Sequence, residues 1–190
     1  MNYFTGPYKS SKHVHAMEMP FDFTTRRALV LDGGDDDRIT LTTVQDFANV
    51  VARAIDFEGE WPVVGGIRGG DMSIGQLIAL GEKIRGACAS LIDVRFVLTL
   101  NEPGAPFKIE KLEADDLESG AWTSSWVPKL DHPSIPAEQV TMFSRIIVAG
   151  ILLALSAKCY SCSDEWNRLL PDYEFAKPEE FLSEAWRGKP

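Results

Sequence analysis

The chain has 190 residues, of which 45% are hydrophobic and 25% charged, and its formal net charge is -9. This length and composition suit one globular domain over residues 1–190, long enough to bury a core of its own. The acidic balance argues against nucleic-acid binding, because contacts to a phosphate backbone need clustered Lys and Arg.

The cysteines and the N-terminal segment indicate a cytoplasmic protein. An odd, sparse set of three cysteines is typical of a reducing compartment: Cys88, Cys159 and Cys162. The last two form a C-x-x-C, but without a surrounding βαβ unit or a second pair it predicts neither a redox motif nor a zinc site. The N-terminal residues lack the apolar core of a signal peptide. The longest apolar run, residues 146–155, is too short to span a bilayer and indicates a buried helix, so no membrane partner is expected.

The first half of the chain predicts strands and helices in loose alternation. Residues 1–23 are irregular, and strands are expected at 28–32 and 39–42, joined as a hairpin. The run from Asp35 to Asp37 between them predicts a solvated turn rather than a metal site. A helix from Thr43, its N-cap, to about Phe57 should follow. Its expected buried face consists of Val44, Phe47, Val50, Val51, Ala54 and Ile55.

A third strand is predicted at 61–66, and a helix begins after Ser73 and ends at Gly86. Gln76 completes a capping box with Ser73. The apolar face of this helix consists of Ile74, Leu77, Ile78, Leu80 and Ile84.

The second half predicts a strand at 94–100, a short helix within 111–120 closed by Gly120, a loop over 121–136 and a long helix over 137–158. The long helix is apolar almost all round in its second half, so another surface should cover it. A last helix is predicted over 178–187, from Pro178. About four strands and five helices place the chain in the α/β class with an α+β tendency. There are too few βαβ units for a full doubly wound sheet.

The stretch VVGGIRGGDMSIGQLIALGEKIRG, residues 63–86, has the strand, glycine turn and helix order of a dinucleotide-binding unit. The fingerprint G-x-G-x-x-G fails here, because Ile67 stands where a pattern begun at Gly65 needs its second glycine. Begun at Gly66, the pattern meets Arg68 and Asp71 instead of glycines. We therefore expect a plain strand-to-helix connection and no cofactor at this turn.

Two segments resemble a known family. DDRITLTTVQDFANVVARAIDFEGEWPVVGG and the following MSIGQLIALGEKIRG are similar to the NmrA-like, isoflavone-reductase-like group of atypical short-chain dehydrogenases in its fungal form. LEADDLESG resembles a later helix of that family, LLPDYEFAKPEEFLSEAW its C-terminal end, and NYFTGPYKSSKHVHAMEMPF its substrate loop. The resemblance covers only the C-terminal, substrate-binding half, without the family's nucleotide-binding half. It implies a partial Rossmann-type fold, and a half-sheet of this kind should be covered in a homodimer, by the 137–158 helix or the N-terminal segment.

The resemblance also suggests where a ligand lies. If the N-terminal segment lines a substrate pocket as in the family, His13, His15 and Tyr8 are the candidate catalytic groups, since an imidazole transfers protons near neutral pH. Asp46 could also act as acid or base, but a helix cap is the stronger interpretation. An aromatic, hydrophobic lining is expected from Tyr3, Phe4, Trp122, Trp126, Met142 and Phe143.

Three functions follow as hypotheses. The first is an enzyme that acts on a hydrophobic secondary metabolite by proton transfer or positioning, with no cofactor. The second is an NADP-dependent reductase whose cofactor half comes from another chain or is missing from a fragment. The third is a non-catalytic ligand-binding or regulatory protein, for which the NmrA-like group has precedent.

Overall fold

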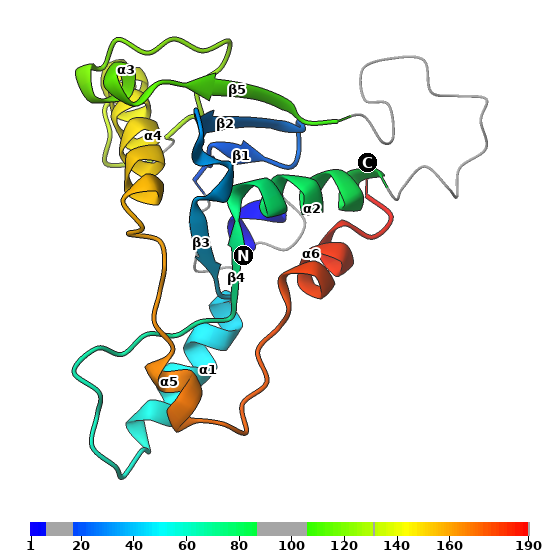
Figure 1. The fold of residues 1–190 in the computed structure, drawn as a ribbon, viewed down its shortest axis with the longest axis vertical. Coiled ribbons are helices and arrows are strands. Elements are labelled where there is room, and N and C mark those ends of the chain that lie inside the picture. The colour runs from blue at the N-terminus through cyan, green and yellow to red at the C-terminus, as the bar shows by residue number, and fades with distance from the viewer. Residues whose placement is uncertain (7–16, 87–105, 131, 190) are drawn as a thin grey trace.

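Two small sheets with helices packed around them organise the chain. The computed structural model describes residues 1–6, 17–86, 106–130 and 132–189. A three-stranded sheet has the order β1-β2-β5, with β1 (Phe21–Asp22) antiparallel and β5 (Lys108–Leu112) parallel to the central β2 (Arg27–Leu31). The β2 side chains from Ala28 to Val30 are fully buried. The predicted α/β class is confirmed (Figure 1).

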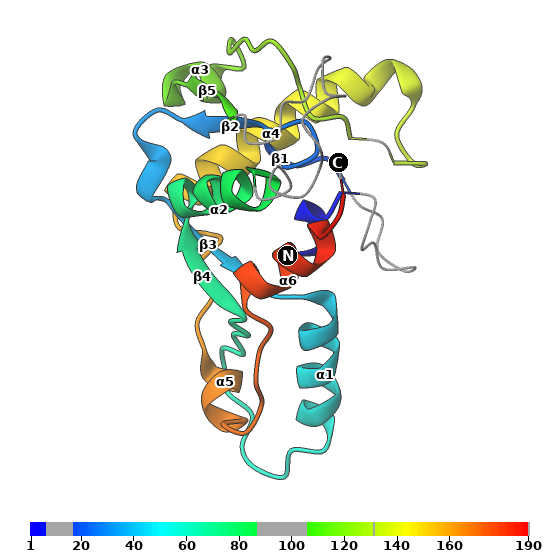
Figure 2. The same cartoon turned by 90° about the vertical axis from the view of Figure 1, so that its right-hand side faces the viewer.

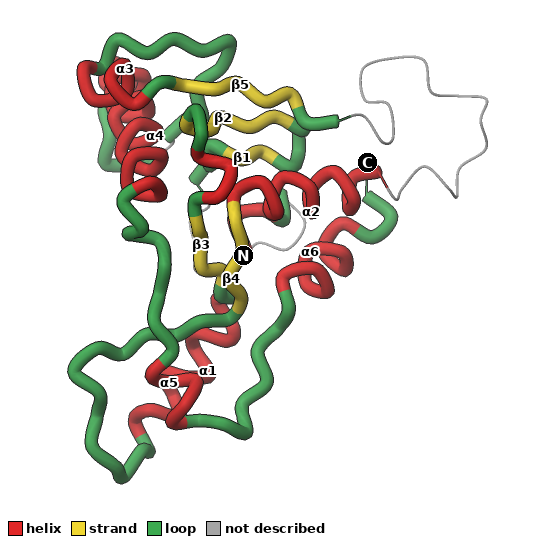
Figure 3. The backbone as a smooth tube through the Cα atoms, in the orientation of Figure 1, coloured by secondary structure: helices red, strands yellow, loops and turns green. Residues whose placement is uncertain are grey.

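The second sheet pairs β3 (Arg38–Leu41) antiparallel with β4 (Gly70–Ser73) (Figure 3). The predicted hairpin of 28–32 with 39–42 is therefore wrong, although strands exist at both places. Gly33 takes a left-handed conformation, with φ 75°, and a 3-10 turn, η2 (Gly34–Asp36), follows it. This turn sends β3 into another sheet, and it leaves Asp35 and Asp36 exposed, as expected for a solvated turn.

Helix α2 (Ile74–Gly86) follows the prediction closely. The Ser73 hydroxyl accepts the Gln76 amide at 3.2 Å, and the Gln76 side chain accepts the Ser73 amide at 2.9 Å, which confirms the capping box. The predicted apolar face is buried, with Leu80 only partly so. At Gly81 a Cβ atom would meet the Phe107 ring at 2.8 Å, so the missing side chain lets the helix approach the strand connection.

The remaining predicted helices also form. These are α3 (Ala114–Ser119), the 3-10 turn η4 (Ala137–Gln139) leading into α4 (Val140–Ser156), and α6 (Pro178–Trp186). Gly120 closes α3 with φ 74°, and Pro178 occupies the first turn of α6.

Helix α4 is buried on one side only. Val148, Leu152 and Leu155 face the main core, whereas Met142 and Ile146 are exposed. The apolar side chains of the second half are buried or partly buried, as expected, and the uncovered ones lie in the first half. The segment Ala137–Ser156 is long and apolar enough to cross a membrane by length and composition, with mean hydropathy 1.7, a test that core helices of soluble proteins also pass.

Helices α1 (Val44–Ile55) and α5 (Glu165–Leu169) form a separate lobe below the β3–β4 ladder (Figures 1 and 2). A small second core holds them together, made of Val50, Ala54, Trp166 and Leu170. The predicted buried face of α1 is wrong for its other four members. Val44, Phe47, Val51 and Ile55 are exposed, because α5 has five residues and covers only one flank of the longer helix.

The strand predicted at 61–66 does not form. The Gly66 amide donates to the Glu165 carboxylate at 3.0 Å, and the Gly66 carbonyl accepts the Trp166 amide at 3.1 Å. These hydrogen bonds direct the backbone to the start of α5 instead of to a strand. The strand predicted at 94–100 and Cys88 lie outside the described residues.

Candidate functional site

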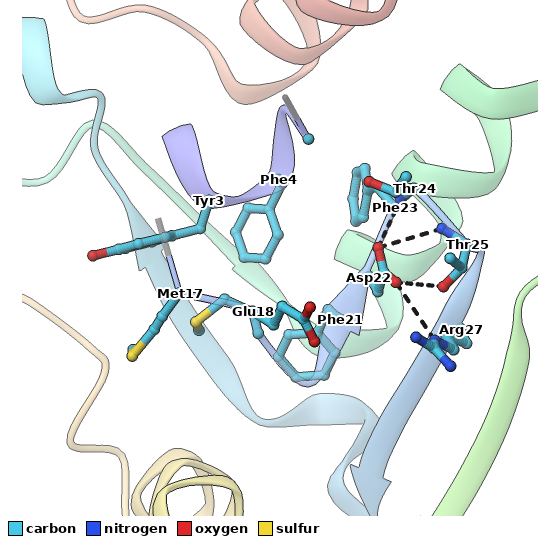
Figure 4. A pocket seen from close by; sticks show the side chains of 12 residues that line it. Tyr3, Phe4, Met17, Glu18, Phe21, Asp22, Phe23, Thr24, Thr25 and Arg27 are labelled. Atoms are coloured by element: carbon cyan, nitrogen blue, oxygen red, sulfur yellow. Dashed lines mark hydrogen bonds and ion pairs between the residues drawn. The ribbon is translucent and has the colours of Figure 1, made fainter. Parts of the chain in front are cut away.

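An aromatic pocket lies between the N-terminal 3-10 turn η1 (Asn2–Phe4) and residues 17–27. Its volume is about 450 Å³, within the usual range of ligand pockets. Aromatic and methionine side chains line most of it: Tyr3, Phe4, Met17, Met19, Phe21 and Phe23. Figure 4 shows Tyr3 and Phe4 on one side, Met17, Glu18 and Phe21 opposite them, and a polar group around Asp22 at one end.

Contacts from distant segments hold the η1 wall in place. The Trp186 indole donates to the Phe4 carbonyl at 2.8 Å, and the Met1 amino group donates to the Thr42 carbonyl at 3.0 Å. The Asn2 side chain accepts the Val44 amide at 3.1 Å and so caps α1. Phe4 packs on Phe23 with ring centroids 5.4 Å apart. The pocket wall is therefore joined to α1, α6 and the main core.

The polar end of the pocket is built on the turn between β1 and β2. The Asp22 carboxylate accepts the amides of Thr24 and Thr25, at 2.9 and 3.3 Å, and the Thr25 hydroxyl. Arg27 lies 3.5 Å from the same carboxylate, and its guanidinium stacks over the Trp126 ring at 4.1 Å. The Arg27 Nε atom is buried without a hydrogen bond. Stacking on Trp126 and the ion pair of Nε with Asp22 fix this cation at the polar end of the pocket.

Glu18 is the second carboxylate at the pocket. It is exposed, and one of its oxygens accepts the Lys129 amide at 2.7 Å. This bond ties the 121–130 loop to the pocket's other wall. Glu18 thus places a carboxylate on the pocket lining.

The structure divides the predicted ligand-lining residues between two places. Tyr3 and Phe4 line the pocket. The candidate catalytic residues Tyr8, His13 and His15 lie outside the described residues. Sequence reasoning missed Arg27 and Asp22, because nothing in the spacing of this turn marks them as neighbours of an aromatic segment.

The other predicted lining residues do not form one aromatic wall. Trp122 and Met142 line a groove of about 460 Å³ between α3 and α4. Trp122 is only 2% exposed, and the Arg145 guanidinium lies over its ring at 4.2 Å. Trp126 is buried against Arg27, and Phe143 is partly buried and lines neither cavity. Trp122 thus contacts Arg145 of α4 and Trp126 contacts Arg27 of β2, so the two rings do not form one wall.

The glycine-rich stretch is shaped for contact with protein rather than with a nucleotide. A Cβ atom at Gly66 would lie 2.3 Å from the Ser163 carbonyl oxygen, and one at Gly65 would lie 2.8 Å from the Trp166 indole nitrogen. The segment preceding and entering α5 thus occupies the space that a pyrophosphate would need. A pyrophosphate therefore does not fit at this turn.

Asp46 lies in a buried polar network. Its backbone amide is capped by the Thr43 hydroxyl at 2.9 Å, which confirms the N-cap. Its carboxylate accepts the Thr43 hydroxyl at 2.6 Å, the Tyr173 hydroxyl at 2.8 Å and the Ala176 amide at 3.3 Å. Asn49 donates to the same tyrosine at 3.0 Å, and burial raises the pKa of Tyr173. The network joins the C-terminal segment to α1, a structural role.

The two described cysteines, Cys159 and Cys162, are free and exposed. Within the described ranges no group of three His, Cys, Asp or Glu side chains is placed to hold a metal ion. His132 is exposed in a loop, where its ring nitrogen accepts the Ser134 amide at 3.1 Å.

The comparisons with known proteins leave the family open. No family model matches the chain, and neither the curated proteins nor the solved structures contain a match. The NmrA-like resemblance therefore stays a prediction.

Proposed function

We propose that the protein binds a hydrophobic aromatic small molecule, of the secondary-metabolite class that the resemblance implies, in the pocket beneath η1. The lining carries this proposal. Four aromatic rings and two methionines surround a cavity of about 450 Å³, and such surfaces hold flat apolar ligands by stacking and by sulfur–aromatic contact.

Arg27 adds a preference for one end of the ligand. Its guanidinium lines the pocket, where it is held against Trp126 and its Nε atom lies 3.5 Å from the Asp22 carboxylate. A ligand with a phenolate, carboxylate or carbonyl group at that end would pair with this cation. The occupant we propose is therefore an aromatic body with one acceptor group.

Cofactor-independent chemistry is the second part of the proposal. Glu18 lines the pocket, so it can exchange a proton with a bound ligand by hydrogen bonding. We propose a proton-transfer or ring-closure reaction without NAD(P), in which the aromatic walls fix the ligand's conformation. The test compares wild type with Glu18→Gln in the presence of a bound ligand. If the substitution changes neither the rate at which the ligand is converted nor the stability of the complex, the protein is a binding module.

The first test uses the aromatic anion 1-anilinonaphthalene-8-sulfonate as a fluorescent probe of the folded protein. Tyr3→Ala removes an exposed ring from the pocket wall and should weaken probe binding about fivefold. Arg27→Met should weaken it by a similar factor. Met142→Ala, in the α3–α4 groove, is the matched control and should change nothing. If Met142→Ala weakens binding and Tyr3→Ala does not, the groove is the site and the proposal fails.

A second measurement addresses the reductase alternative. Thermal unfolding is followed while NADP and NADPH are titrated to millimolar concentration. A ligand that binds only the folded state must raise its stability, so a saturable rise in melting temperature would establish a nucleotide site. We expect no shift from this chain alone, because the resemblance lacks the family's nucleotide-binding half and the glycine-rich turn is filled by the segment around Ser163.

A further inference from the structure

The outward face of α1 is apolar along its whole length. Six residues at helical spacing share this face, and all are exposed: Val44, Phe47, Ala48, Val51, Ala52 and Ile55. Phe47 is 55% exposed and Ile55 is 73% exposed. The helix uses its other apolar flank for α5, so this face has no partner among the described residues.

The face matches itself when one copy is turned end for end. An antiparallel pair centred between Asn49 and Val50 places Phe47 opposite Ala52 of the second copy, and Ala48 opposite Val51. Val44 then meets Ile55 at the two ends. Large side chains oppose small ones at the two central positions, as ridges fit into grooves between packed helices. Every contact also occurs twice, as a two-fold axis requires.

Charge does not oppose this pairing. The two ionised side chains of α1 point elsewhere, since Asp46 is buried in its own network and Arg53 pairs with Asp172 at 2.7 Å. Neither charge has to lose water when the two faces meet.

The area of the face sets the strength of the contact. At these exposures the six side chains would bury on the order of 450 Å² of accessible surface per copy, or roughly 900 Å² in the pair. Stable interfaces bury roughly 1,200–2,000 Å² in total. A pair of this size is a weak, reversible dimer.

We propose that a second copy of this chain docks on α1, antiparallel and through these six residues. The site differs from the 137–158 helix and the N-terminal segment, which the sequence favoured as dimer surfaces. It is independent of the ligand pocket, because the exposed α1 face and the pocket share no residue.

Sedimentation velocity over roughly 1–200 µM tests the proposal, with dissociation expected in the tens of micromolar. Phe47→Glu puts a charge at the centre of the face and should weaken the dimer at least about tenfold. Ile146→Glu is the matched control, because Ile146 is equally exposed on α4 and should leave the dimer unchanged. Circular dichroism checks that each variant is folded, and Ala52→Glu replaces Phe47→Glu if that variant unfolds.

A double variant tests the antiparallel orientation. In Phe47→Glu/Ala52→Lys each new carboxylate faces a new ammonium of the other copy, so dimerisation should return, whereas a parallel pair would oppose like charges. A wild type that stays monomeric at every concentration overturns the proposal. So does a dimer that survives Phe47→Glu or dissociates with Ile146→Glu.

Discussion

At the scale of single residues, Asp46 shows how a helix cap extends into tertiary structure. Its carboxylate accepts three hydrogen bonds, two of them from the 173–176 segment more than 120 residues away in sequence. Asp46→Ala should lower the free energy of unfolding by about 2–3 kcal/mol, because it leaves buried donors without an acceptor. Urea denaturation measures this.

Tyr173→Phe supplies the second arm of a double-mutant cycle. Alone it should cost about 1–2 kcal/mol, because it removes both the hydrogen bond to Asp46, which keeps other donors, and the one accepted from Asn49. Together with Asp46→Ala the two losses should fall short of additivity by at least about 0.5 kcal/mol. Additive losses would show that the hydrogen bond between them contributes little.

Glu110 makes the stability of the molecule depend on acid pH. Hydrogen bonds from the Ser125 hydroxyl and amide, with smaller help from Ser124 and Lys108, lower the pKa of Glu110 from 4.5 to about 2. Since the folded pKa lies below the unfolded value, this stabilisation is complete above pH 4.5 and is lost as the pH falls toward 2. Glu110→Gln should cost about 1–2 kcal/mol at pH 7, after allowance for solvent screening.

Unfolding free energies of wild type and Glu110→Gln, measured across this pH range, check the sign. Their difference should shrink as the pH approaches 2. Glu113, exposed at the start of α3, provides the control. The unfolding free energy of Glu113→Gln should differ from that of wild type by the same amount at every pH. A Glu110→Gln effect of constant size would assign the loss to packing rather than to charge.

At the scale of elements, local signals predicted helices well and strands poorly. The capping box at Ser73, the closing Gly120 and the first-turn Pro178 each mark a helix end within the sequence itself, and the structure has all three. Strand β4 contains Gly70 and Asp71, which have low strand propensity, and only pairing with β3 makes it a strand. Such pairing cannot be seen in a local window.

In the candidate site, too, local features could be predicted and contacts between distant residues could not. Tyr3 and Phe4 could be predicted to line a pocket because they belong to an aromatic, irregular segment. The Arg27–Trp126 stack joins residues about a hundred positions apart, and no spacing rule connects them. The valine pair at 63–64 predicted a strand by apolar character, yet both side chains are exposed because hydrogen bonds at Gly66 fix the backbone.

Two glycines provide an element-scale test of close packing. Gly66→Ala should destabilise by about 2 kcal/mol or more, because the new Cβ atom would lie 2.3 Å from the Ser163 carbonyl oxygen. Gly150→Ala should stabilise by about 0.5–1 kcal/mol, since Gly150 lies inside α4 with nothing within 4 Å of the added atom. Thermal unfolding compares the stability of both variants with that of wild type. Equal stability changes would mean that backbone entropy alone, and not the contact at Gly66, determines them.

At the scale of the whole molecule, two cores of unequal size share one chain. The main core joins both sheets to α2, α4 and α6, whereas the second consists of four buried residues between α1 and α5. A small core has fewer contacts to lose on opening, so the α1–α5 lobe should open while the main core stays intact. The proposed dimer face lies on this less stable lobe, and the ligand pocket lies beside the main core.

Hydrogen exchange of the Phe47→Glu variant, in which dimer formation does not protect α1, tests this independence. Amides of α1 should exchange faster than those of β2. Trp166→Ala removes the largest side chain of the small core, which packs edge-on against Phe57 and Trp61 with centroids 5.6 and 5.1 Å away. A loss of about 3 kcal/mol there should speed α1 exchange about 100-fold and leave β2 unchanged. Equal acceleration in both elements would mean that the molecule opens only as one cooperative unit, with the β3–β4 ladder transmitting the loss to the main core.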